Sequence, residues 1–118
     1  YPVFGYEDNI NLHKNIHQMI KHIIMFRFIN ANSDQDKLLK AKRMKEVFEP
    51  LKQKINVVQS YEIGINLKQT DFSYDLAITS TYRSWDDLET YIKHPEHQNA
   101  IKACSDIQKE KAVVDYEI

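Results

Sequence analysis

The segment Tyr91-Ile92-Lys93-His94-Pro95-Glu96-His97 is the most informative part of this sequence. Upstream of it, Ser84 and Asp87 form a capping pair, which predicts that a helix begins there. Pro95 disfavours helical geometry at the residue before it and suits the first turn of a new helix. The sequence therefore predicts a helix that breaks just before Pro95 and a further helix from Pro95 to about Lys109.

Four other segments have the composition of strands, being rich in β-branched and aromatic residues or alternating between apolar and polar ones. They are residues 19–29, 57–66, 74–82 and 112–118. Only a short polar connector separates the second from the third, which predicts an antiparallel hairpin. In the first strand, alternation puts His22, Ile24 and Phe26 on one face. Its opposite face is also apolar, so we expect both faces to be covered.

A helix is expected between the first two strands. Ser33 and Asp36 resemble a capping pair, and apolar residues then recur three or four positions apart. This stripe consists of Leu38, Ala41, Met44, Phe48 and Leu51. Pro50 should interrupt the helix near its end, because proline removes a backbone donor.

The resulting order, β-α-β-β-α-α-β, is the ferredoxin-like split βαβ pattern with its second helix broken in two. It predicts an α+β fold with a four-stranded antiparallel sheet and helices on one face. A second copy of the chain is the simplest cover for the other face. Two such sheets meeting face to face would form a homodimeric α+β barrel with a central cavity.

Composition narrows the class of protein. A chain of 118 residues suggests one domain, which we place at residues 19–118 after an N-terminal extension over residues 1–18. The formal net charge of −1 provides no global field for nucleic acid or an anionic membrane. No stretch approaches the length of a membrane span. The single cysteine, Cys104, fits a reducing compartment, so a cytoplasmic location is expected.

One phenol and three imidazoles are the candidate functional groups, and such groups transfer protons near neutral pH without a cofactor. His97 lies near a helix start, where the positive end of the helix disfavours imidazolium, so it should act as a neutral base. Tyr91 could stabilise a developing enolate, and His22, facing the barrel interior, could orient a substrate.

Simpler interpretations stay open for each of these residues. Tyr91 could merely pack beside neighbouring apolar side chains, and His22 could be a hydrogen-bonded core residue. His94 could serve only to cap the helix that begins at Pro95. A metal site at His94 and His97 is weakly indicated by spacing alone, so neither a metal nor another cofactor is predicted.

Four segments carry a resemblance to a known family. They are Lys-His-Ile-Ile-Met-Phe at 21–26, Tyr-Asp-Leu-Ala-Ile at 74–78, Tyr-Ile-Lys-His-Pro-Glu-His at 91–97 and Ala-Val-Val-Asp-Tyr-Glu at 112–117. In order and spacing they resemble the stress-responsive dimeric α+β barrel family, called Dabb. The resemblance extends from Met19 to Ile118, and the His-Pro-x-His motif is its most specific part.

The resemblance implies a homodimer whose sheets form a barrel with helices outside. A plant member, olivetolic acid cyclase, closes a polyketide ring without a cofactor. In that branch the tyrosine and the last histidine of the motif are the catalytic pair, and they match Tyr91 and His97 here. The strand histidine matches His22.

These observations lead to one functional expectation and two alternatives. We expect a cytoplasmic, homodimeric, stress-responsive barrel protein that binds a small apolar or aromatic molecule, and neither nucleic acid nor membrane. The expected ligand-binding residues are His22, Ile24, Phe26, Tyr91, His94 and His97. The enzyme alternative is a cofactor-free cyclase, lyase or isomerase acting on a polyketide-like carbonyl compound through Tyr91 and His97. The second alternative is a purely structural role, in which the side chains of the protein itself fill the pocket.

Overall fold

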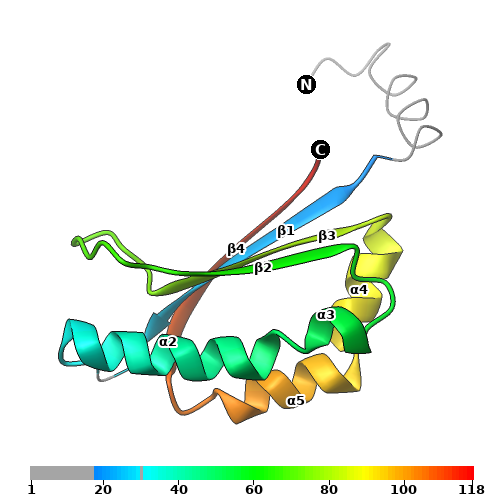
Figure 1. The fold of residues 1–118 in the computed structure, drawn as a ribbon. Coiled ribbons are helices and arrows are strands. Elements are labelled where there is room, and N and C mark those ends of the chain that lie inside the picture. Colours follow the sequence, from blue (N-terminus) through cyan, green and yellow to red (C-terminus); the bar gives the residue numbers. More distant parts are fainter. Residues whose placement is uncertain (1–17, 30) are drawn as a thin grey trace.

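The computed structural model describes residues 18–29 and 31–118, so the extension expected over residues 1–18 lies almost entirely outside the described residues. One sheet is covered on one face by helices, as Figure 1 shows. The elements are β1 (Ile20–Phe28), α2 (Asp34–Phe48), α3 (Leu51–Lys54), β2 (Ser60–Ile65), β3 (Leu76–Tyr82), α4 (Trp85–Lys93), α5 (Pro95–Ala103) and β4 (Gln108–Glu117).

The sheet has four strands in the order β2-β3-β1-β4, and every neighbouring pair is antiparallel. This is the ferredoxin-like arrangement that the sequence predicts. Residues directly opposite one another on neighbouring strands point to the same face. The register therefore forms rows across the sheet, and the row Tyr61–Ser80–His22–Asp115 faces the helices.

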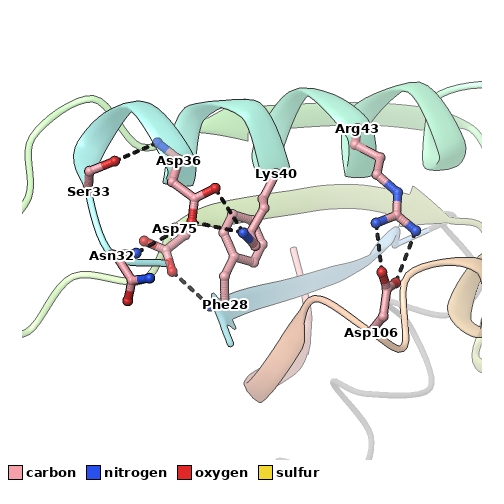
Figure 2. A network of polar contacts seen from close by, with 8 residues as sticks. All are labelled: Phe28, Asn32, Ser33, Asp36, Lys40, Arg43, Asp75 and Asp106. Atoms are coloured by element: carbon pink, nitrogen blue, oxygen red, sulfur yellow. Dashed lines mark hydrogen bonds and ion pairs between the residues drawn. The ribbon is translucent and has the colours of Figure 1, made fainter. Parts of the chain in front are cut away.

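Both expected capping pairs are confirmed. The Ser33 hydroxyl accepts from the backbone N–H of Asp36 at 3.0 Å, and the Ser84 hydroxyl accepts from that of Asp87 at 3.1 Å. Figure 2 shows the first of these at the start of α2. The expected interruption near Pro50 is also present, because α2 ends at Phe48 and α3 begins at Leu51.

The end of the last helix and the start of the last strand differ from the prediction. Helix α5 ends at Ala103, not near Lys109, and β4 begins at Gln108, not at Ala112. The extra strand residues find partners because β1 is long enough to pair with them, from Phe26 opposite Lys111 to Phe28 opposite Gln108. Strand pairing of distant segments thus overrides the local helical pattern.

An ion pair supports this shortened helix. The guanidinium of Arg43 on α2 donates to both carboxylate oxygens of Asp106, at 2.9 and 3.0 Å (Figure 2). It also donates to the carbonyl oxygen of Ala103 at 2.9 Å. The Arg43 side chain therefore satisfies a carbonyl at the helix end and ties the α5–β4 turn to α2. Both charged groups are substantially exposed, so their contribution to stability is modest.

The hydrophobic core lies between the helices and one face of the sheet. The stripe expected on the first helix is buried at Ala41, Met44, Phe48 and Leu51, and Leu38 is half-buried. The sheet contributes Ile20, Phe26, Phe28, Leu76, Ile78 and Tyr82. The interior of the domain therefore combines both sets of apolar side chains.

No helix of the described residues covers the opposite face of the sheet (Figure 1). Its central strand presents Ile23 and Met25, which are only half-buried, and β4 adds Val114 and Tyr116, which are 50% and 38% exposed. We call these four residues, with the cross-strand neighbours Ala77 and Thr79, the open sheet face. It is the apolar second face that the sequence predicts for the first strand, and no other element of residues 18–29 and 31–118 covers it.

A buried carboxylate secures the end of β1. Asp75 is only 3% exposed and accepts a hydrogen bond from the backbone N–H of Phe28 at 2.8 Å (Figure 2). The amide of Gln69 donates to its other oxygen at 3.4 Å. Asp75 therefore satisfies a buried backbone donor where the strand register between β1 and β4 shifts.

Replacing Asp75 by alanine is expected to lower the free energy of unfolding by about 2 kcal/mol, because the buried N–H of Phe28 loses its acceptor. Asp75→Asn keeps an acceptor oxygen and should cost clearly less. Urea denaturation followed by circular dichroism measures both. Equal losses in the two variants would show that the hydrogen bond to Phe28 is not the reason for the burial.

Candidate functional site

A cavity of about 410 Å³ lies between the sheet and the helices α2, α4 and α5. Three strands provide its floor and the helices provide its walls. The lining residues are His22, Ile24, Phe26, Phe48, Ile78, Tyr91, Ile92, His97, Gln98, Ile101, Gln108, Lys111, Val113 and Asp115. Most of the surface that lines the cavity is apolar, and polar side chains from β1, α4, α5 and β4 interrupt it.

Five of the six expected site residues meet at this cavity: His22, Ile24, Phe26, Tyr91 and His97. His94 is not among its lining residues. The His94 ring caps α5 instead, with Nδ1 accepting from the backbone N–H of Glu96 at 3.1 Å. The simpler interpretation of His94 as a helix cap is confirmed.

The position of the cavity corrects one expectation. His22 does not face a barrel interior between two sheets, because it lies on the helix-covered face together with Ile24 and Phe26. Both faces of β1 are apolar, so the sequence pattern alone does not distinguish them. The cavity is formed within one chain, between its own sheet and helices.

A backbone carbonyl next to the helix break determines which nitrogen of the neutral His97 ring carries the proton. The carbonyl oxygen of Ile92 lies just before the break and accepts from His97 Nδ1 at 2.9 Å and from Gln98 Nε2 at 2.7 Å. A carbonyl can only accept, so Nδ1 carries a proton, and in the neutral ring Nε2 keeps its lone pair. Burial lowers the pKa of His97; the hydrogen bond to the Ile92 carbonyl opposes this lowering, and the positive charge of Lys111 adds to it.

The lowered pKa of His97 agrees in direction with the neutral ring expected from the sequence. Burial of the ring is the largest cause of this lowering.

Tyr91 is buried beside both histidines. Its ring centroid lies 4.4 Å from that of His97 and 6.2 Å from that of His22. Its hydroxyl is hydrogen-bonded to the Tyr61 hydroxyl at 2.8 Å. Burial raises the pKa of Tyr91 far above its usual range. The phenol therefore stays protonated and is suited to donating a hydrogen bond, not to acting as a base.

His22 is held by a carboxylate that sequence reasoning missed. His22 is 6% exposed, and its Nδ1 is hydrogen-bonded to Asp115 of β4. Sequence reasoning also missed Tyr61 as the hydrogen-bond partner of Tyr91. Both Asp115 and Tyr61 could have been found from the strand register, which aligns Tyr61, Ser80, His22 and Asp115 in one row.

The described residues contain neither a cluster of metal-ligating side chains nor a membrane-spanning helix. Within residues 18–29 and 31–118, no group of three histidine, cysteine, aspartate or glutamate side chains is arranged to hold a metal ion. No helix in the same ranges is long and apolar enough to cross a membrane.

Comparison with known sequences identifies the family. The sequence model of the stress-responsive A/B barrel domain, Dabb, matches residues 20–118. The chain belongs to the Dabb family. The match includes the strand with His22 and the segment from Tyr91 to His97, so all the cavity residues lie within the Dabb domain.

Similar proteins agree with this Dabb fold. A dimeric, ferredoxin-like protein of unknown function from Bacteroides fragilis is 33% identical, has a TM-score of 0.74, and the alignment covers 85% of this chain and 96% of that one. The hydroxynitrile lyase of Passiflora edulis has a TM-score of 0.70 at 16% identity, and the alignment covers 86% of this chain and 94% of the lyase. An uncharacterised Streptomyces coelicolor protein is 29% identical over 84 residues, covering 70% of this chain and 84% of that protein.

Protonation of His97 in this Dabb domain should affect its stability. The folded state depresses the pKa of His97, so between that lower value and the ordinary 6.5 the unfolded chain binds more protons. The stabilising contribution of neutral His97 is therefore present above about pH 6.5 and decreases as the pH falls through this window.

We expect the urea midpoint to fall less between about pH 7.5 and pH 5.5 in His97→Gln than in the wild type. Two-dimensional NMR of the imidazole should show His97 titrating below the ordinary histidine pKa. A His97 pKa at or above the ordinary value would contradict the buried, neutral ring.

Proposed function

We propose that this stress-responsive Dabb protein is a homodimer that binds a small apolar or aromatic molecule in the cavity beneath its helices. The observation that carries the proposal is the cavity itself. Its volume of about 410 Å³ falls within the range of about 300–1,000 Å³ that small-molecule pockets occupy. An apolar floor with a few convergent polar groups is also typical of such pockets.

The open sheet face supports the homodimer. Its apolar residues, including Ile23 and Val114, have no cover within the described chain, and the Bacteroides fragilis relative with the same fold is dimeric. A second copy packed on this face would bury these side chains. The cavity is on the other side of the sheet, so each protomer would carry its own site.

A fluorescent apolar probe tests ligand binding. N-phenyl-1-naphthylamine is neutral, and its emission should rise on entering the cavity. Val113 lines the cavity and is 49% exposed, so Val113→Trp should obstruct the mouth without disturbing the core. We expect binding at least about tenfold weaker, equivalent to about 1.4 kcal/mol.

Leu39→Trp is the matched control, because Leu39 is exposed on α2 and does not line the cavity. Absence of probe binding to the wild type, or equal binding by both tryptophan variants, would contradict a ligand site in this cavity.

A second candidate function is proton transfer at a carbonyl compound, as in a cofactor-free cyclase, lyase or isomerase. The Nε2 lone pair of His97 and the adjacent, protonated Tyr91 support it. His97 would remove a proton from the carbon next to a carbonyl, and Tyr91 would donate a hydrogen bond to the carbonyl oxygen as negative charge develops. Tyr61 would hold the Tyr91 hydroxyl in position.

Exchange of the methyl protons of 2-acetonaphthone with deuterium oxide, followed by NMR, tests this chemistry without knowledge of the natural substrate. We expect exchange to slow by about a hundredfold or more in His97→Gln and to fall in Tyr91→Phe, with probe binding retained. No acceleration by the wild type would leave ligand binding as the function.

A further inference from the structure

The cavity has opposite charges at its two ends. Among its lining residues Lys111 is the only permanently cationic side chain and Asp115 is the only acidic one, and both lie on β4. The register places Lys111 opposite Phe26, Val113 opposite Ile24, and Asp115 opposite His22. Three residues of strand lie between the two charged residues, so their Cα atoms are four steps, or about 13 Å, apart.

The two charges differ in how they are satisfied. Asp115 is hydrogen-bonded to His22, which also lines the cavity. Lys111 takes part in no side-chain hydrogen bond or ion pair with any described residue. The basic members of the ion pairs among the described residues are His22, Arg27, Lys40, Arg43 and Lys54. Its ammonium nevertheless lies close enough to His97 to lower the pKa of that ring.

The surroundings of Lys111 are apolar on the sheet side. It ends the row Ile65–Leu76–Phe26–Lys111, which crosses all four strands on the helix-covered face. A cation at the rim of an apolar floor matches a molecule with an apolar body and an anionic end.

We propose that the ligand of this cavity is an amphipathic monocarboxylate, whose apolar or aromatic body lies over Ile24, Phe26 and Val113 and whose carboxylate pairs with Lys111. The inference rests on the proposed ligand-binding function and adds the charge and the orientation of the ligand. Asp115 repels an anion at the far end, so the carboxylate has one favourable position. A single unpaired cation matches a single negative charge better than a phosphate dianion.

Competition against N-phenyl-1-naphthylamine, using 2-naphthoate and its neutral isostere 2-naphthamide, tests the inference. At about 20 mM salt the wild type should bind the carboxylate about five- to tenfold more tightly than the amide, since partly exposed charge pairs contribute modestly. The preference should shrink at about 500 mM salt, where charges are strongly screened.

Three variants locate the charge that recognises the ligand. Lys111→Met should abolish the preference for the carboxylate and raise the pKa of His97, whereas Lys111→Arg should retain most of the preference. Lys42→Met removes an equally positive charge from an exposed helix position outside the cavity lining and should change nothing.

The outcomes separate this inference from the function on which it rests. Equal binding of both naphthalene compounds to the wild type, with no effect of Lys111→Met, would overturn the carboxylate inference and leave ligand binding intact. Failure of the probe and both competitors to bind would overturn both. A preference for 2-naphthoate that survives Lys111→Met would show that another group binds the carboxylate, and it would overturn the role of Lys111.

Discussion

Val114→Glu is expected to dissociate the proposed homodimer into monomers with the 14.0 kDa mass of one chain. Val114 is 50% exposed on the open sheet face, where the proposed second copy would cover it. Packing the two sheets together would bury the new carboxylate of each protomer without a partner, at a cost of several kcal/mol. We expect the dimer dissociation constant to rise by about a hundredfold or more.

The adjacent residue offers a closely matched control. Val113 is 49% exposed on the same strand but points to the cavity side, so Val113→Glu introduces the same charge on the opposite face of the sheet. It should leave the dimer intact and weaken binding of the neutral probe. Sedimentation equilibrium measures both masses. Dissociation by Val113→Glu but not by Val114→Glu would place the dimer contact on the cavity side of the sheet and contradict a dimer formed through the open sheet face.

Phe48→Ala is expected to lower the free energy of unfolding by about 3–5 kcal/mol, as truncation of a buried phenylalanine does. The Phe48 ring is fully packed at the end of α2, 6.1 Å from that of Phe26 and edge-on to His97 at 6.4 Å between centroids. The residue separates the hydrophobic core from the cavity, so its loss removes contacts on both sides.

Leu39→Ala on the exposed face of α2 is the comparison, and it should change stability by less than about 0.5 kcal/mol. Urea denaturation of both variants is done at one fixed protein concentration, since the proposed dimerisation would add to the apparent stability. A loss below about 1 kcal/mol for Phe48→Ala would show that the ring is loosely packed and the cavity wall is not rigid.

Local signals made much of this fold predictable. Ser33 and Ser84 begin their helices as the capping pairs indicate, and Pro95 restarts a helix where the chain bends. These features depend on residues close together in sequence, so the order of elements, and with it the ferredoxin-like topology, follows from the pattern.

Features that depend on pairing between distant segments were not predictable in the same way. β4 begins at Gln108 because β1 offers it partners, although residues 104–109 continue the apparent helical pattern. The hydrogen bonds between His22 and Asp115 and between Tyr61 and Tyr91 depend on strand register and on the position of α4. The choice of which apolar face of β1 the helices cover likewise needs the three-dimensional structure.

Mapping of amide NMR shifts with 2-naphthamide tests most directly whether the ligand site lies between the sheet and the helices of one chain. We expect shifts at Ile92, His97 and Val113, with Thr79 and Val114 on the opposite sheet face unchanged. Shifts concentrated at Thr79 and Val114 would place the ligand between two sheets and contradict a site beneath the helices.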